Sequence, residues 1–193
     1  MTDEQKVSSR SFRFEATSIQ GLTLIYPPLY EDERGYYMKR YEKRIYEENG
    51  IFFTPHEEAQ SKSMKGVIRG MHFQIEHPQA KLARIAKGKA FDVAIDLRFG
   101  SPTFGKWQGF YLSEENGMML YIPEGFAHGM MALEDDTLLC YASGDTYSPK
   151  TDGGVRWNDP DIGIQWPLEQ VEKPILSEKD SKLPTLREYL KLL

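Results

Sequence analysis

The 193-residue sequence lacks several features that define large classes of protein. Cys140 is its only cysteine, so no internal disulfide can form, and this favours a reducing compartment, the cytoplasm. No apolar run approaches the roughly 20 residues that cross a bilayer, and the polar N-terminus lacks the apolar stretch of a signal peptide. The net charge of −5 argues against a nucleic-acid-binding surface, which is usually basic. We therefore expect a soluble protein with neither membrane nor nucleic-acid partners.

Motifs for several catalytic mechanisms are also missing. The sequence has no glycine-rich phosphate loop before a helix and no serine-centred nucleophile elbow. Cys140 lies between Leu139 and Tyr141, where a buried, unreactive thiol is expected. His72 is followed two positions later by Gln74 rather than by a second histidine, which disfavours a metal site. General acid–base chemistry is the mechanism that remains.

The apolar residues, 40% of the chain, fall in short runs separated by turn residues. These runs occupy residues 21–28, 66–74, 81–98, 107–113, 118–125, 129–136 and 137–149. Residues 90–97 alternate apolar and polar side chains, which is typical of half-buried strands. We expect helices only at 39–49 and 183–193, and an arm at 1–17 that is flexible or is a strand lent to a partner subunit. The whole chain, 1–193, reads as one all-β domain.

His72 and His128 are the two histidines, out of four, that lie inside strand-like segments. Alternation along a strand places residues 69 and 71 on one face and residues 68, 70, 72 and 74 on the other, unless a bulge intervenes. Each histidine could be a hydrogen-bonded structural residue or a catalyst, and composition alone does not decide between them.

The order of several motifs resembles the dTDP-4-dehydrorhamnose 3,5-epimerase family, a branch of the cupin fold. The matching stretches are DERG (32–35), GVIRGMHFQ (66–74), residues 80–109, LSEENGMMLYIPEGFAHG (112–129), residues 147–167 and LSEKDSKLP (176–184). The resemblance implies a jelly-roll barrel, a homodimer that exchanges N-terminal strands, and a nucleotide-diphosphate sugar as the bound partner.

The same resemblance assigns four catalytic residues. His72 occupies the position of the base in the RG-x-H motif, and Asp180 that of the aspartate paired with it. Lys81 occupies the position beside the sugar carbonyl, and Tyr141 that of the acid on the opposite face. Considered one at a time, Lys81 could be a surface lysine, Asp180 a helix cap and Tyr141 a core aromatic residue.

Six further residues match substrate-binding positions of the family. Arg34 and Arg69 match diphosphate ligands, His128 and Asp92 match a second polar pair in the barrel, and Tyr37 and Tyr147 are assigned to substrate binding.

The implied reaction inverts C3, C5 or both in a nucleotide-linked 4-keto-6-deoxy sugar. The hydrogens on both carbons are α to the carbonyl, so a base, an acid on the opposite face and a cation at the enolate oxygen suffice. No metal or cofactor is required. An enzyme that inverts a single position, a non-catalytic sugar-nucleotide-binding cupin and a metal-dependent oxygenase are the alternatives.

The sequence departs from the family at positions expected to hold the nucleotide. Lys39 stands where a glutamate is common, Glu57, Glu58 and Ala59 replace Gln-Asp-Asn, and Thr146 replaces a tyrosine. We hypothesise that the epimerase chemistry is retained while the nucleotide or sugar differs from dTDP-4-keto-6-deoxyglucose.

Overall fold

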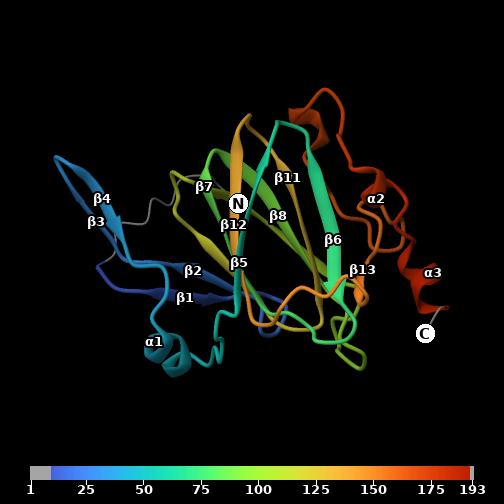
Figure 1. Ribbon diagram of the computed structural model, residues 1–193, viewed down its shortest axis with the longest axis horizontal. Coiled ribbons are helices and arrows are strands. Elements are labelled where there is room, and N and C mark those ends of the chain that lie inside the picture. The colour runs from blue at the N-terminus through green and yellow to red at the C-terminus, as the bar shows by residue number, and fades with distance from the viewer. Residues whose placement is uncertain (1–9, 192–193) are drawn as a thin grey trace.

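Two antiparallel β-sheets face each other in the computed structural model, which describes residues 10–191 (Figure 1). The first sheet has the order β1 (Arg13–Ala16), β2 (Thr23–Tyr26), β10 (Met119–Ile122), β7 (Lys81–Lys87), β12 (Thr137–Ser143) and β5 (Glu57–Ser63). The second has the order β13 (Asp152–Gly154), β6 (Ile68–Gln74), β11 (Phe126–Ala132), β8 (Lys89–Asp96) and β9 (Trp107–Ser113). The predicted all-β jelly-roll barrel is confirmed.

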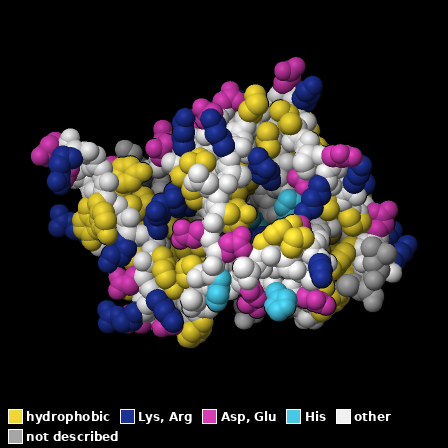
Figure 2. All heavy atoms as spheres, viewed as in Figure 1, with side chains coloured by type: hydrophobic (Ala, Val, Ile, Leu, Met, Phe, Trp, Pro, Cys, Tyr) yellow, Lys and Arg dark blue, Asp and Glu magenta, His cyan; other side chains and the backbone are white. Residues whose placement is uncertain are grey.

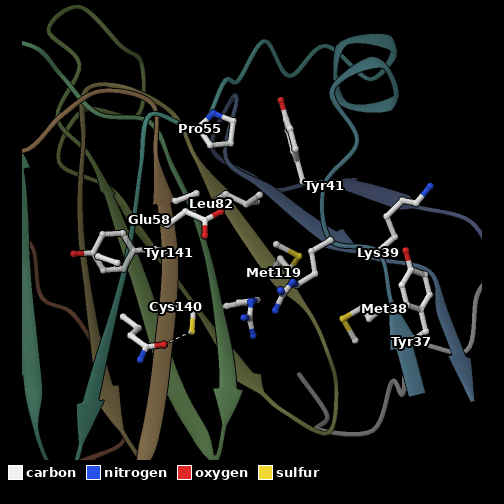
Figure 3. A pocket seen from close by; sticks show the side chains of 15 residues that line it. Tyr37, Met38, Lys39, Tyr41, Pro55, Glu58, Leu82, Met119, Cys140 and Tyr141 are labelled. Carbon is white, nitrogen blue, oxygen red and sulfur yellow. Dashed lines mark hydrogen bonds between the residues drawn. The ribbon is translucent and has the colours of Figure 1, made fainter. Parts of the chain in front are cut away.

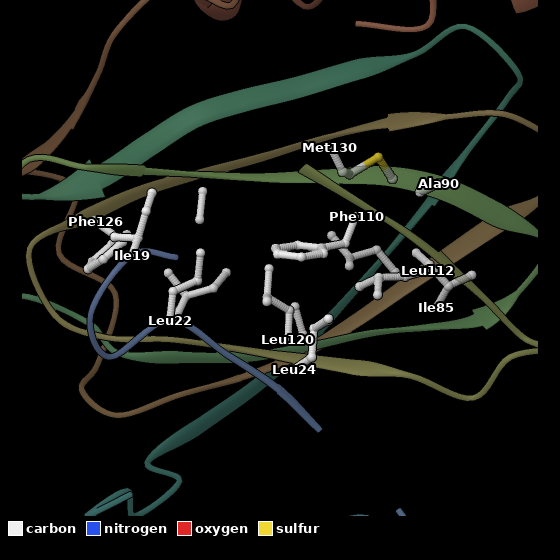
Figure 4. Close-up of a cluster of buried hydrophobic side chains, with 14 of the residues drawn as sticks. Ile19, Leu22, Leu24, Ile85, Ala90, Phe110, Leu112, Leu120, Phe126 and Met130 are labelled. Carbon is white, nitrogen blue, oxygen red and sulfur yellow. The ribbon is translucent and has the colours of Figure 1, made fainter. Parts of the chain in front are cut away.

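The main core lies between the two sheets. Side chains from both inner faces, among them Leu24, Leu120, Phe110, Leu112 and Met130, pack there with little or no exposure to solvent (Figure 4). Fully burying one such side chain stabilises the fold by about 1.5–3 kcal/mol. Inward residues alternate with outward ones, which is the period of two seen in the sequence.

Each sheet also has a covered outer face. Residues 155–190 pack over the five-stranded sheet, where Trp166 and Leu186 join Ile68, Met71 and Val93 in a second cluster. Helix α1 (Lys43–Glu48) and the segments beside it cover part of the six-stranded sheet. The layer formed by residues 155–190 lies over β6, the strand that carries His72.

The predicted helices are shorter in the structure, and two further short helices were not predicted. Of the segment expected to be helical at 39–49, only α1 is helical. Glu42 has an extended backbone and is the N-cap, so the helix begins at Lys43. In the tail, the helix α3 (Leu186–Leu190) begins after Pro184 with a capping box formed by Thr185 and Glu188. Helix α2 (Glu178–Ser181) and the 3-10 helix η1 (Leu168–Gln170) were not predicted. No helix within residues 10–191 is long and apolar enough to span a bilayer.

The N-terminal arm is partly an ordered strand of the chain's own sheet. Arg13–Ala16 forms β1 and pairs with β2 of the same chain, so this part of the expected arm belongs to the chain's own sheet. Residues 1–9 lie outside the described part of the chain. The strands β3 (Leu29–Asp32) and β4 (Gly35–Met38) follow as a two-stranded hairpin that projects from the body of the molecule (Figure 1).

A buried carboxylate fixes the loop between β8 and β9. Asp96, fully buried, accepts hydrogen bonds from Arg98 at 2.8 and 2.9 Å and from the hydroxyls of Ser101 and Thr103 at 2.6 Å. Burial alone would raise the pKa of Asp96, but the hydrogen bonds from Arg98, Ser101 and Thr103 outweigh it and the pKa is strongly lowered.

We expect Asp96→Asn to lower the free energy of unfolding by about 3 kcal/mol at pH 7, since it leaves Arg98 without its charge partner. A carboxyl with a lowered folded-state pKa stabilises the fold above its unfolded pKa and loses that contribution as pH falls through the folded value. The difference between variant and wild type should therefore shrink between pH 7 and pH 3 in urea unfolding curves. Asp136→Asn, at an exposed carboxylate paired with Lys62 and Lys87, is the control. An equal loss at both pH values would contradict the assignment.

Candidate active site

A cavity of about 270 Å³ lies between the two sheets and is bordered by α2. Its lining residues come from both walls and from α2: Ser61, Arg69, His72, Lys81, His128, Gly129, Met130, Leu139, Tyr141, Ser177, Lys179 and Asp180. The space-filling view shows a hollow with a histidine inside it and charged side chains of both signs near its rim (Figure 2). All four residues predicted to be catalytic thus line one cavity.

His72 and Asp180 form a hydrogen-bonded pair on the wall made by β6. His72 Nε2 lies 2.6 Å from Asp180 Oδ1, and Asp180 is 4% exposed. Ser177 caps α2 by accepting a hydrogen bond from the Asp180 backbone N–H at 3.0 Å, which fixes the aspartate facing β6. Burial would raise the pKa of Asp180, but the hydrogen bond and charge of His72 outweigh it and the pKa is lowered. Asp180 therefore stays ionised and holds the imidazole in one orientation.

A bulge in β6 overturns the alternation expected at residues 69–72. Arg69 and His72, three positions apart, line the same cavity, whereas Ile68 and Met71 are buried on the outer side of the sheet. The register with β11 shifts here, because His72 pairs with His128 and Arg69 pairs with Met130. The two residues between, 70 and 71, thus oppose the single Gly129.

Glycine is required at the bulge. Gly70 has a φ of +121°, and a Cβ there would lie 2.5 Å from the Cα of Gly129 and 2.8 Å from the carbonyl oxygen of His128. The close approach of the two backbones thus depends on the absence of a side chain.

His128 and Asp92 form a second imidazole–carboxylate pair beside the first. His128 Nε2 lies 3.0 Å from both carboxylate oxygens of Asp92, and both residues are buried. The adjacent strands place His128 directly opposite His72. The predicted pairing of His128 with Asp92 is therefore present in the geometry, and His128 reaches the cavity while Asp92 lies behind it.

Lys81 and Tyr141 lie on the opposite wall, in the six-stranded sheet. The ammonium of Lys81 is 5.9 Å from the centre of the Tyr141 ring, and within residues 10–191 no hydrogen bond or ion pair reaches it. Burial lowers the pKa of Lys81, and the carboxylates of Asp152 and Asp92 partly offset this. Burial, and then the charge of Glu57, raise the pKa of Tyr141, so its phenol is protonated at neutral pH.

Arg69 lines the cavity, and Tyr147 is connected to its lining residue Lys179 through Asp152. The Nε of Arg69 donates to the Ser63 hydroxyl at 2.9 Å. Tyr147 is 53% exposed and donates from its hydroxyl to Asp152 at 2.8 Å. Asp152 also accepts a hydrogen bond from Lys179, which lines the cavity. The cavity therefore opens beside a cluster of charged and aromatic side chains.

Arg34 and Tyr37 are not brought to this cavity within one chain. Arg34 lies in the exposed turn of the β3–β4 hairpin, where it pairs with Asp32. Tyr37 lines a different and larger groove, about 610 Å³, on the outer face of the six-stranded sheet (Figure 3). That groove contains no histidine, and Figure 3 shows the ring of Tyr141 turned away from it. The smaller cavity is therefore the candidate site, since Tyr141 borders both but only the smaller cavity is also lined by His72, Lys81 and Asp180.

Comparison with known proteins agrees with this geometry. The family model for dTDP-4-dehydrorhamnose 3,5-epimerase matches residues 16–188. The chain belongs to this epimerase family. The dTDP-4-dehydrorhamnose 3,5-epimerase of Methanothermobacter thermautotrophicus is 49% identical over 92% of this chain and 96% of its own length.

Solved structures of relatives share the fold at high similarity. The 3,5-epimerase of Legionella pneumophila, in complex with dTDP-4-keto-L-rhamnose, is 40% identical with a TM-score of 0.88 and covers 91% of this chain and 93% of its own. A dTDP-4-dehydrorhamnose 3-epimerase from Streptomyces niveus is 38% identical over 91% of this chain and 84% of its length. Epimerases of this kind therefore include proteins named for one position and proteins named for two.

The residues at or near this cavity that were not predicted to belong to it include Lys179, Asp152 and Ser61. Lys179 precedes Asp180 in the LSEKD motif, and Asp152 directly follows the YSPKT stretch. Both residues therefore lie in stretches that match the family and could have been named from them. Ser61 lies in a polar segment, EEAQSKS, that shows no apolar alternation. Within residues 10–191, no three histidine, cysteine, aspartate or glutamate side chains form a group that could hold a metal.

Proposed function

We propose that this protein inverts C3, C5 or both of dTDP-4-dehydro-6-deoxyglucose, by removing a proton from one face of the ring and returning one to the other. The single observation that carries the proposal is that His72 and Tyr141 line one cavity from opposite sheets. The names of the relatives support the substrate. A binding protein without catalysis would need neither a base nor an acid at these places.

His72 acts as the base in this proposal. Its Nε2 faces Asp180, so the tautomer with hydrogen on Nε2 leaves Nδ1 with a free lone pair. Removing the proton α to the carbonyl gives an enolate on the substrate and an imidazolium on His72, which the Asp180 carboxylate stabilises. The two carbons are both α to the same carbonyl, so one base can serve each in turn.

Lys81 and Tyr141 complete the reaction. The Lys81 ammonium stabilises the negative charge that develops on the enolate oxygen, and its lack of a hydrogen-bonded or ion-paired protein partner among the described residues leaves it available. The Tyr141 phenol then donates a proton from the other wall, and its raised pKa keeps that proton in place until the enolate forms. No step requires a metal or a cofactor.

The nucleotide extends out of the cavity in this arrangement. The cavity volume, about 270 Å³, is close to the lower end of ligand pockets, roughly 300–1,000 Å³, so it suits the sugar rather than the whole substrate. Arg69 would bind the diphosphate, and the exposed ring of Tyr147 would stack on the base.

A homodimer supplies a role for the hairpin residues. Tyr30, Tyr36 and Tyr37 are all about half exposed on the projecting β3–β4 hairpin, together with the guanidinium of Arg34. An exposed aromatic surface of this kind is typical of a binding interface. We infer that the hairpin contacts a second copy, where Arg34 and Tyr37 would reach the partner's substrate.

A cytoplasmic location stays a prediction from the single cysteine.

The decisive experiment is NMR of dTDP-4-dehydro-6-deoxyglucose in D2O with the purified protein. Deuterium incorporation at C3 and C5, together with product chemical shifts that differ from those of the starting sugar, would support the proposal and report which positions react. Absence of exchange at both carbons would overturn it. Exchange and inversion at C3 alone would identify a single-position epimerase.

The nucleotide hypothesis needs a separate measurement. Glu57 and Ala59 lie on the face of β5 that bears Ser61, and the Glu57 carboxylate accepts the Tyr147 backbone N–H at 2.7 Å. Glu58 and Ala59 both border the outer groove. The names of the relatives favour dTDP, so calorimetric titration of dTDP, CDP, UDP and GDP should show the tightest binding for dTDP. Preference for another nucleotide would support the altered specificity inferred from the substitutions.

Lys81→Met is expected to lower kcat by about 100- to 1,000-fold, because the enolate oxygen loses its cation while the side-chain length is kept. Lys87→Met is the matched control on the same strand, since Lys87 is exposed and pairs with Asp136. Steady-state rates by NMR or coupled assay would measure both. A Lys81→Met enzyme with a wild-type kcat would remove Lys81 from the mechanism.

A further inference from the structure

The segment 144–151 connects β12 of the six-stranded sheet to β13 of the five-stranded sheet, and it carries Tyr147. Two consecutive backbone N–H groups of this segment donate to side chains. The N–H of Tyr147 donates to the Glu57 carboxylate at 2.7 Å, and that of Ser148 donates to Gln74 Oε1 at 2.6 Å. Because Glu57 belongs to β5 and Gln74 to β6, the segment is tied to both sheets at adjacent residues.

The two ties differ in their support. Gln74 is buried, and its Nε2 donates a further hydrogen bond to the Thr146 backbone oxygen at 3.2 Å. The Glu57 side chain has a single role, because among residues 10–191 no hydrogen bond or ion pair reaches it other than the one from Tyr147. Loss of the carboxylate would therefore release Tyr147 from the six-stranded sheet and leave the segment attached to the five-stranded one.

The strand register places the Glu57 tie beside the wall that carries Tyr141. Ala59 pairs with Tyr141, and Glu57 lies two residues before Ala59 on the same face of β5. The Tyr147 ring is about half exposed, so packing does little to hold it. Apart from the bond from its hydroxyl to Asp152, the position of the ring depends on its backbone.

We propose that Glu57 is a positioning residue, which holds the Tyr147 backbone against β5 and so fixes the exposed Tyr147 ring for stacking on a nucleotide base. The assignment rests on the proposed function, because it takes a sugar nucleotide as the ligand. Glu57 is one of the positions where the chain departs from the usual residues of its family. Its carboxylate binds the protein's own backbone and acts on the nucleotide only through Tyr147.

Hydrogen–deuterium exchange of the ligand-free protein tests the tie itself. In Glu57→Ala the amides of residues 144–151 should exchange about tenfold faster than in the wild type, since a hydrogen bond to a charged acceptor is lost. Exchange within β8 should not change. Glu57→Gln keeps an oxygen that accepts the same N–H, so it should restore most of the protection.

Calorimetric titration with dTDP tests the consequence for binding. Glu57→Ala should bind dTDP about fivefold more weakly, because the released Tyr147 must be ordered again when the base stacks on it. Glu57→Gln should stay within about twofold of the wild type. In a Tyr147→Ala background the same Glu57→Ala change should cost no further affinity, because no ring remains to be positioned.

Asp135→Ala is the matched control. The exposed Asp135 carboxylate also accepts a backbone N–H from a distant segment, that of Lys65 at 3.0 Å, and Asp135 does not line the cavity. This variant should leave both the exchange of residues 144–151 and the affinity for dTDP unchanged.

Three results would overturn the assignment while leaving the proposed function intact. The first is wild-type exchange of residues 144–151 in Glu57→Ala, and the second is an equal loss of protection in Glu57→Gln and Glu57→Ala. The third is a loss of dTDP affinity that multiplies with that of Tyr147→Ala, which would mean that Glu57 contacts the nucleotide directly. A wild-type protein that binds no dTDP would instead overturn the proposed function, and the exchange measurement would still decide whether Glu57 holds the segment.

Discussion

Tyr141→Phe is expected to separate proton exchange from inversion. His72 and Asp180 remain in place on the β6 wall, so the variant should still remove the substrate proton and form the enolate. With no phenol on the opposite wall, the proton returns from the face it left, and the original configuration is restored. Inversion should fall by about 10²- to 10⁴-fold, the usual range for loss of a general acid, while deuterium exchange continues.

NMR in D2O measures both quantities in one sample. Deuterium at C3 or C5 with the remaining signals at the chemical shifts of the starting sugar would be the signature of exchange without inversion. Tyr111→Phe is the matched control, because Tyr111 is a partly buried tyrosine that packs against Phe91, away from the cavity. A Tyr141→Phe enzyme that inverts at the wild-type rate would assign the acid to another group.

The sequence allowed the pairing of distant residues to be predicted only through the ordered motifs. Spacing alone gives no reason for His72 to meet Asp180, which is 108 positions away, because the contact depends on how residues 155–190 pack over the outer face of β6. The all-β class was predictable from the short alternating runs, which favoured a sandwich or a barrel, whereas the jelly roll itself came from the resemblance. The polar strand β5 was not predictable, because EEAQSKS forms the edge of its sheet and contributes only Ser63 to the fully buried residues.

The local geometry at Arg69 and His72 shows a second limit. Simple alternation places these residues on opposite faces, and the bulge at Gly70 places them on one. The signal in the sequence was Gly70 together with Gly129, but the effect of the two glycines depends on a contact between strands that are distant in the chain. Arg34 and Tyr37 show a third limit, since their proposed role requires a second subunit.

His72→Asn is expected to abolish exchange together with inversion. Without the His72 imidazole the α-proton loses the base proposed to remove it, so both deuterium exchange and inversion should fall by about 10²- to 10⁴-fold. This outcome differs from that of Tyr141→Phe, in which exchange survives. His77→Asn is the matched control, because His77 is exposed and its positive φ of 56° is one that asparagine tolerates.

Adding Asp180→Asn to His72→Asn provides a sharper test of the pair. Asp180 acts on the reaction only by orienting His72 and stabilising its protonated form, so once the imidazole is gone the second change has nothing further to remove. The double variant should therefore be about as slow as His72→Asn alone, although Asp180→Asn by itself is also slow. If the two losses multiplied instead, the two side chains would act on the substrate independently. The hydrogen bond between His72 Nε2 and Asp180 Oδ1 would then be structural, and the base would have to be sought elsewhere on the cavity wall.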